Sequence, residues 1–158
     1  MIFIHYGHKH FDKQRFIRSP HRNGEVQQLL NKPSKGFWGS PINSKNSWRD
    51  FCLSEDFRVS SLNKYFVFAL KKSARVLKVM NTTDMLYLYR KYGMRGDHGR
   101  QYLDWKRITK SYDAMVLMIP TNNFDLLCDL NLTSWDVDSV VVFNPDVIVE
   151  LPERERAQ

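Results

Sequence analysis

Residues 135–148 read WDVDSVVVFNPDVI and carry the clearest strand signal in this chain of 158 residues. The run from Val137 to Phe143 is rich in β-branched residues, which favour extended backbone. Asn144-Pro145-Asp146 follows as a turn signal, because proline and short polar residues interrupt regular structure. Val147 to Leu151 predicts one more strand, so the end of the chain is expected to lie in a sheet.

Five stretches upstream also have strand composition, with aliphatic and aromatic residues bounded by turn-forming ones. These predicted strands span residues 1–6, 37–41, 65–70, 75–79 and 114–119, with a turn at Lys71-Lys72-Ser73. The strands are mixed with helices in no regular alternation. The sequence therefore predicts an α+β fold.

A first helix is predicted after residue 42, from a polar cap and from apolar residues at helical spacing. Asn43 or Ser44 would cap it, and Ser44, Trp48 and Phe51 would share one face. A second helix would begin at a threonine, 82 or 83, and run through Tyr89.

The remaining segments are assigned from composition and from residue spacing. Residues 103–112 predict a third helix, and residues 25–30 predict a helical turn. Residues 8–19 are expected to form a polar connection, and residues 93–99 a loop. A chain of this length fits one domain, which we expect to span residues 1–151, with 152–158 as a charged tail.

Composition excludes several classes of protein. Hydrophobic residues make up 42% of the chain and aromatic residues 13%, which is not the composition of a disordered protein. No run approaches the ~18 apolar residues of a membrane helix, and the apolar N-terminus is too short for a signal peptide. The only two cysteines, Cys52 and Cys128, are expected to be core or near-core residues in a reducing cytoplasm.

The net charge of +7 is placed unevenly along the chain. Residues 1–110 contain 22 Lys/Arg and 8 Asp/Glu, whereas residues 111–158 contain 2 and 9. A basic body of this kind attracts nucleic acid or an acidic protein. The alternative is a solvated surface whose two parts neutralise one another in the fold.

Common catalytic motifs are missing from the sequence: there is no phosphate-binding glycine loop, dinucleotide fingerprint or serine nucleophile elbow. His8 and His10 lie two residues apart, and on a strand they would share a face. No obvious third ligand accompanies them, so we predict no metal site.

Three motifs remain, and they follow one another along the chain. His5-Tyr6-Gly7 closes the first predicted strand, where glycine lets a ligand approach the backbone. Residues 36–41, GFWGSP, are followed by residues 44–52, SKNSWRDFC. The third motif is the stretch 135–148, where two aspartates and a serine precede the late strand.

In this order the motifs resemble the ADP-ribosyltransferase fold, on the side of the diphtheria-toxin-like and poly(ADP-ribose)-polymerase-like enzymes. In that family the first strand ends in a histidine, and a second strand carries an aromatic residue. A helix then carries a Ser-Lys-Ser element and a second aromatic residue, and a late hydrophobic strand follows. The resemblance implies a split mixed or antiparallel sheet with flanking helices, and NAD as substrate without a metal.

Carried over residue by residue, the resemblance implies an NAD site. His5 would hold a hydroxyl of the adenosine-side ribose, and the backbone of Tyr6 with the hydroxyl of Ser44 or Ser47 would hold the carboxamide. Trp38 and either Trp48 or Phe51 would enclose the nicotinamide ring, because flat aromatic faces stack on heteroaromatic rings. The implied NAD-binding residues are His5, Tyr6, Gly7, Trp38, Ser40, Ser44, Ser47, Trp48 and Phe51.

The family's catalytic glutamate has no counterpart here. Asp138 or Ser139 falls at its place, depending on a one-residue shift, and Asp136 lies two residues before Asp138. A carboxylate is needed because cleavage of the nicotinamide–ribose bond builds positive charge on the ribose. Asp138 is the first candidate and Asp136 the reserve, with His5 completing the predicted catalytic set. In a strand, Asp136 and Asp138 would share a face, and Ser139 would point to the other side.

The resemblance thus implies a cytoplasmic, toxin- or effector-like ADP-ribosyltransferase that modifies a macromolecule, either RNA or DNA or an acidic protein. An NAD glycohydrolase, with water as acceptor, is a close variant. Because the glutamate is missing, an inactive nucleic-acid-binding module on the same fold is the main alternative. A small interaction protein, whose acidic last third covers a basic partner, is another.

Overall fold

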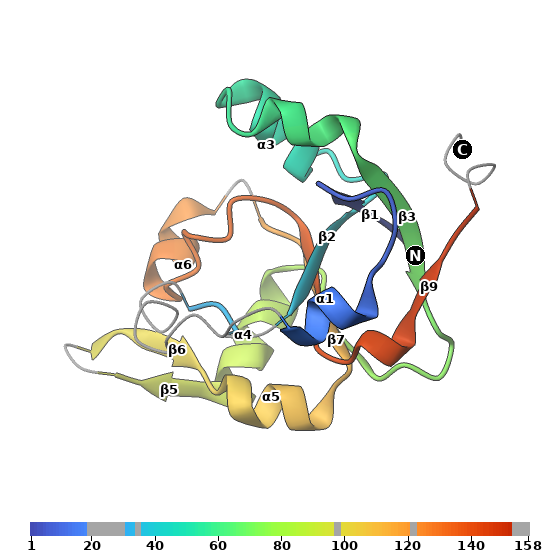
Figure 1. Cartoon of the computed structure of the whole chain (residues 1–158). Coiled ribbons are helices and arrows are strands. Elements are labelled where there is room, and N and C mark those ends of the chain that lie inside the picture. Colours follow the sequence, from blue (N-terminus) through green and yellow to red (C-terminus); the bar gives the residue numbers. More distant parts are fainter. Residues whose placement is uncertain (19–30, 34–35, 97–98, 121–122, 153–158) are drawn as a thin grey trace.

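In the computed structural model, the main sheet contains seven strands: β1 (Ile2–Tyr6), β2 (Phe37–Pro41), β3 (Tyr65–Leu70), β4 (Val76–Val79), β7 (Ala114–Leu117), β8 (Ser139–Val142) and β9 (Ile148–Glu150). They form one mixed sheet in the order β4-β7-β8-β2-β1-β3-β9 (Figure 1). The pair β4 and β7 is parallel, and the other pairs are antiparallel. The structure describes residues 1–18, 31–33, 36–96, 99–120 and 123–152. All seven predicted strands, and the α+β class, are confirmed.

β7 and β8 are buried on both faces, which explains why their sequences are continuous apolar runs without alternation. Val140 and Val142 of β8 face one core of the molecule, whereas Val141 faces the other. Val116 and Met115 of β7 divide between the same two cores. The sheet is therefore covered on both sides.

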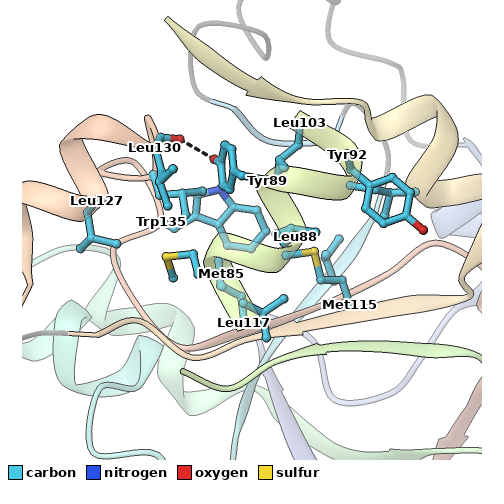
Figure 2. Packing of buried hydrophobic residues seen from close by; sticks show 14 residues of the cluster. Met85, Leu88, Tyr89, Tyr92, Leu103, Met115, Leu117, Leu127, Leu130 and Trp135 are labelled. Atoms are coloured by element: carbon cyan, nitrogen blue, oxygen red, sulfur yellow. Dashed lines mark hydrogen bonds between the residues drawn. The ribbon is translucent and has the colours of Figure 1, made fainter. Parts of the chain in front are cut away.

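The helices are α1 (Lys13–Arg18), α3 (Trp48–Ser54), α4 (Thr82–Tyr92), α5 (Trp105–Ser111) and α6 (Phe124–Asp129), with 3₁₀ turns η1 (Val59–Asn63) and η3 (Pro145–Val147). The larger core joins α4, α5 and α6 to one face of the sheet. Figure 2 shows Trp135 and Met85 deep in this core, with the Tyr89 hydroxyl hydrogen-bonded to the carbonyl of Leu130.

The second core is mainly aromatic. Phe3, Phe66 and Phe68 are buried in it, and Phe37 packs against them from β2. The rings of Phe37 and Phe66 lie 5.8 Å apart. These rings fill the space beneath the end of β1, and they fix the position of the residues that follow it.

Two predicted helix caps are wrong by a few residues. Ser47, not Asn43 or Ser44, caps α3, and its Oγ accepts a hydrogen bond from the N–H of Asp50. Asn81 caps α4 in the same way. In both cases the preferred cap is the residue whose side-chain oxygen reaches a free N–H three positions later.

Other boundaries also need correction. The predicted loop 93–99 contains a strand, β5 (Gly93–Arg95), which pairs with β6 (Gln101–Leu103) in a separate hairpin. Leu103 therefore belongs to β6, and α5 starts two residues later. The polar connection 8–19 contains α1, which packs Phe16 on Phe37 at 6.3 Å. The helical turn predicted at 25–30 lies outside the described residues.

β2 changes partner along its length. Its first residues, Phe37 to Gly39, pair with β8, whereas Ser40 and Pro41 pair with β1. The ladder between β1 and β2 stops at Ile4, so the last residues of β1 leave β2. Within the described part of the chain, no helix combines the length and apolar character needed to cross a membrane.

Candidate functional site

A cleft with a volume of about 600 Å³ lies where β1 and β2 separate. Its walls come from the end of β1, from β2, from the start of α3, from η1 and from the segment that leads into β8. Seven of the predicted site residues line it, namely His5, Tyr6, Gly7, Trp38, Ser40, Trp48 and Asp136. Ser44, Ser47, Phe51 and Asp138 are not among its lining residues.

The imidazole of His5 bridges the gap between β1 and β2. Its Nδ1 lies 2.7 Å from the carbonyl oxygen of Trp38, and its Nε2 lies 2.9 Å from Nδ1 of His8. A carbonyl only accepts hydrogen bonds, so we assign the ring proton of His5 to Nδ1. Nε2 is then an acceptor that faces His8. Burial lowers the pKa of His5 to about 4, which keeps the ring neutral at pH 7.

Three tryptophans give the cleft aromatic walls. Trp38 packs on Trp135 with ring centroids 5.0 Å apart, and both rings line the cleft. Trp48 lies 5.4 Å from Phe51 in a stacked arrangement. Because Phe51 is outside the lining, it supports Trp48 from behind. Of the two alternatives for the second aromatic residue, the structure places Trp48 at the cleft.

The serines divide between the cleft and the helix cap. Ser47 Oγ donates to Asp50 Oδ2 at 2.6 Å and accepts from the N–H of Asp50, so it is used by the cap of α3. Ser44 lies before the helix, and its Oγ donates to Asp138 Oδ2 at 2.6 Å. Ser40 lines the cleft and accepts from the N–H of Trp48 at 3.2 Å, which leaves its own proton to donate.

Asp138 is buried, and its two carboxylate oxygens are occupied. Oδ2 accepts from Ser44, and Oδ1 accepts from the N–H of Ile119 at 2.7 Å. Its own N–H donates to the carbonyl of Asn46 at 2.9 Å. Asp138 therefore joins the loop before α3 to the end of β7, and the role of its carboxylate is structural.

Asp136 and Ser139 both line the cleft, which corrects the expectation that Asp136 and Asp138 share a face. The expectation assumed that the alternation of a strand extends back to Asp136. The strand in fact starts at Ser139, and a bend at Val137 breaks the alternation of side chains. Asp136 is exposed, and Ser139 is buried with its Oγ donating to the carbonyl of Val137 at 2.9 Å.

Sequence reasoning missed the cations of the cleft, Lys32 and Arg58. Lys32 Nζ lies 5.8 Å from the ring centroid of Trp38. Burial lowers its pKa, and Asp136 acts in the opposite direction. Arg58 adopts a left-handed backbone with φ of 51°, which is uncommon for a residue other than glycine. No local motif marks either residue, because both reach the cleft through tertiary folding.

Gly7 ends β1 at the mouth of the cleft with φ of 105°, a conformation that only glycine adopts readily. Its N–H donates to the carbonyl of Lys64 at 2.6 Å. The neighbouring phenol of Tyr6 has a raised pKa because of burial, so it stays protonated. The chain thus turns away from the sheet directly beside His5.

The predictions for the cysteines and for the pair His8 and His10 also have outcomes. Cys52 is buried as expected, but Cys128 is exposed, because α6 turns it toward solvent. His8 and His10 do not share a strand face, since β1 ends at Tyr6; His8 contacts His5, whereas His10 contacts Glu150. Among the residues that the structure describes, no three His, Cys, Asp or Glu side chains gather as a metal site.

Comparisons with protein-family models, with curated proteins and with solved structures find no match to this chain.

Proposed function

We propose that the cleft binds NAD and that the chain is an ADP-ribosyltransferase, with the ADP-ribosyltransferase-like sheet that the sequence motifs imply. The observation that carries this proposal is the lining of the cleft. Three motifs that are far apart in sequence each contribute residues to it, including His5, Trp38, Trp48 and Asp136. The partner change of β2 supports a split sheet. A volume of about 600 Å³ suits a nucleotide cofactor.

The nicotinamide end of NAD is assigned to the aromatic part of the cleft. The rings of Trp38 and Trp48 offer flat faces for stacking, and Trp135 supports Trp38 at 5.0 Å. The free proton of the Ser40 hydroxyl supplies a donor for the carboxamide oxygen. Ser40 thereby takes the part that the resemblance gave to Ser44 or Ser47.

The ribose and pyrophosphate are assigned to the polar part of the cleft. The proton of the His5 ring is on Nδ1, where it is donated to the carbonyl of Trp38, so Nε2 is an acceptor. Once His8 moves aside, Nε2 accepts a hydrogen bond from a ribose hydroxyl. Lys32 and Arg58 give two positive charges for the pyrophosphate.

Asp136 is the carboxylate that we assign to catalysis. The bond between ribose C1′ and the nicotinamide nitrogen breaks, the electron pair leaves with nicotinamide, and positive charge builds on the ribose. An exposed carboxylate at the cleft stabilises that charge more in the transition state than in the ground state. The acceptor's lone pair then forms the new bond to C1′, and its proton passes to solvent or to Asp136. Asp138 is left out of this role, because both its oxygens are engaged.

The test is nicotinamide release from NAD by the purified protein, alone and with cellular RNA, DNA or protein. We expect Asp136→Asn to lower the release rate by about 10²–10³-fold, the effect of removing one group that stabilises transition-state charge. Asp129→Asn is the matched control, because Asp129 is an exposed carboxylate on α6 away from the cleft. It should keep the wild-type rate.

Asp138→Asn separates the two aspartates. Asparagine keeps the shape and one acceptor oxygen, so the folded variant should still release nicotinamide while its unfolding midpoint falls. Loss of release in Asp138→Asn with full activity in Asp136→Asn would reverse our assignment. If the folded wild-type protein releases no nicotinamide in any mixture, the proposed enzymatic activity is excluded. Equal release without any macromolecule would identify a glycohydrolase.

A further inference from the structure

A second cavity, with a volume of about 530 Å³, lies at the opposite end of β8 from the cleft. Ser139 begins β8 at the cleft, whereas Val142 at the other end pairs with Ala114, next to Asp113. The cavity is formed by the end of α4, the end of α5 and the approach to β4. In Figure 1, α5 and α3 accordingly lie at opposite ends of the molecule. We call it the basic cavity; its lining is Arg75, Lys91, Tyr92, Arg107, Lys110, Ser111 and Tyr112.

The charge of the basic cavity is not balanced. Its described lining contains four cations and no carboxylate. Arg75 is paired with Asp113, with Nε 3.2 Å from Oδ2. Within the described residues, Lys91, Arg107 and Lys110 form no ion pair. Three positive charges therefore converge on one open surface that has no counter-ion among the described residues, which is an arrangement suited to a polyanion.

The ring of Tyr92 holds two of these cations in place. Lys91 Nζ and the guanidinium of Arg107 each lie 5.3 Å from the ring centroid of Tyr92, which is buried. Arg107 also donates to the carbonyl of Lys91 at 3.4 Å. Two cations on one buried ring are positioned before any ligand arrives, so binding costs less side-chain entropy.

An exposed ring stands beside the cavity. Tyr87 is 57% exposed, and Lys91 Nζ lies 5.8 Å from its ring centroid. A tyrosine so exposed, next to a row of cations, offers a face on which an unpaired base stacks. A base in a duplex has no free face, so this ring favours single strands over duplexes.

We propose that the basic cavity binds single-stranded nucleic acid. The backbone phosphates lie on Lys91, Arg107 and Lys110, with the hydroxyl of Ser111 as a further donor, and one base stacks on Tyr87. The site is separate from the cleft and binds whether or not the cleft acts on NAD. Failure of one proposal therefore leaves the other standing.

The experiment measures the fluorescence anisotropy of a labelled oligo(dT) strand titrated with the full chain, without NAD. The triple variant Lys91→Gln, Arg107→Gln and Lys110→Gln removes the unpaired charges. We expect it to weaken binding at least about tenfold and to lower the slope of log affinity against log salt by about 2, the value for three single-strand phosphate contacts. Tyr87→Ala should weaken binding by about tenfold with the salt slope unchanged.

The matched control is Lys71→Gln, Lys72→Gln and Lys78→Gln, which removes the same charge from exposed lysines outside the cavity. It should keep an affinity within about threefold of wild type. Equal losses in the two triple variants would overturn the proposal, because they would show attraction by net charge alone. Binding of a duplex more tightly than its single strand would also overturn it. Full displacement of the strand by tripolyphosphate at equal phosphate concentration would overturn the proposal as well, because it would show that the cavity binds a small polyphosphate.

Discussion

At the scale of single residues, His5 shows how one side chain serves both the fold and the proposed site. Its Nδ1 bonds the carbonyl of Trp38 at the place where β1 has already left β2. The side chain thus bonds to β2 where the backbone ladder between β1 and β2 has ended. Its ring also lies 4.4 Å from that of Phe37, at the edge of the aromatic core. A protonated imidazole is poorly tolerated there.

This burial predicts a pH dependence of stability. The pKa of His5 falls from 6.5 to about 4 on folding, so between these values the unfolded chain binds a proton that the folded chain does not. The free energy of unfolding should therefore fall as the pH is lowered from 6.5 to 4, by up to about 3 kcal/mol from this residue. His8, whose pKa is also lowered by burial, acts in the same direction.

Urea unfolding of wild type and of His5→Gln at several pH values between about 4 and 7 measures the effect. Glutamine does not titrate, so the variant should show a flatter dependence of unfolding free energy on pH. Equal slopes in the two proteins would show that another group governs acid unfolding. Asp113, whose pKa of about 2 is lowered by Arg75, reduces stability mainly below about pH 4, and it does so equally in both proteins, so it does not affect the comparison.

Seven of the residues that line the cleft were predicted as site residues from the sequence, and the differences have identifiable causes. His5, Trp38 and Trp48 sit in motifs whose order predicted one site. Asp138 was favoured over Asp136 because it falls at the place of the family's glutamate. The chain bends at Val137, and Asp136, not Asp138, lines the cleft. Lys32 and Arg58 are ordinary surface residues by type, so composition alone does not distinguish them.

At the scale of elements, the strands were predictable and the short helices were less so. β8 and β7 are runs of β-branched and aliphatic residues, and short runs of this composition favour buried strands. α6 and β5 have mixed polar sequences, and tertiary contacts decide their structure. The cap of α3 could have been found, because Ser47 followed by Asp50 three residues later is the pattern of a capping box.

Asn31 ties several elements together, which the sequence did not reveal. Its Nδ2 donates to Tyr89 Oη at 2.6 Å and to the carbonyl of Leu130 at 3.2 Å, and its Oδ1 accepts from the N–H of Leu103 at 2.9 Å. Its carbonyl accepts from Trp135 Nε1 at 3.1 Å. The side chain of Asn31 therefore links α4, β6 and the end of α6, and its backbone carbonyl adds Trp135.

Replacing Asn31 should be costly. Asn31→Ala leaves the N–H of Leu103 buried without a partner and weakens the network around Tyr89, which should lower the free energy of unfolding by roughly 2–4 kcal/mol. Asn43→Ala is the control, because Asn43 is exposed, and it should change stability by less than about 0.5 kcal/mol. Urea unfolding at neutral pH compares them. Similar small changes in both variants would show that Asn31 does not organise this region.

At the scale of the whole molecule, the charges of the two parts of the chain meet in the fold. His10 contacts Glu150, Lys13 contacts Asp146, and Arg75 contacts Asp113. Each contact joins the basic body to the acidic last third, so part of the sequence asymmetry is neutralised, as the alternative interpretation expected. Among the described residues, the cations without an ion pair include Lys32 and Arg58 of the cleft and Lys91, Arg107 and Lys110 of the basic cavity.

The arrangement of the two sites could not have been foreseen from the sequence. The order of strands places β2 between β1 and β8, although the three are far apart along the chain. Pairings of this kind depend on contacts between distant residues, which no local pattern specifies. The motifs therefore indicated which residues belong together, and the sheet determined where they meet.

The four tryptophans allow a direct measurement on the cleft. Trp38, Trp48 and Trp135 line it, whereas Trp105 packs on Trp135 at 6.0 Å but lies outside the lining. The indole N–H signals of ¹⁵N-labelled Asp136→Asn protein, assigned with single Trp→Phe variants, are followed while NAD is added. We predict saturable shifts that are largest at Trp38 and Trp48 and smallest at Trp105. No saturable shift of Trp38 and Trp48 in the folded protein at millimolar NAD would contradict the assignment of the cleft as an NAD site.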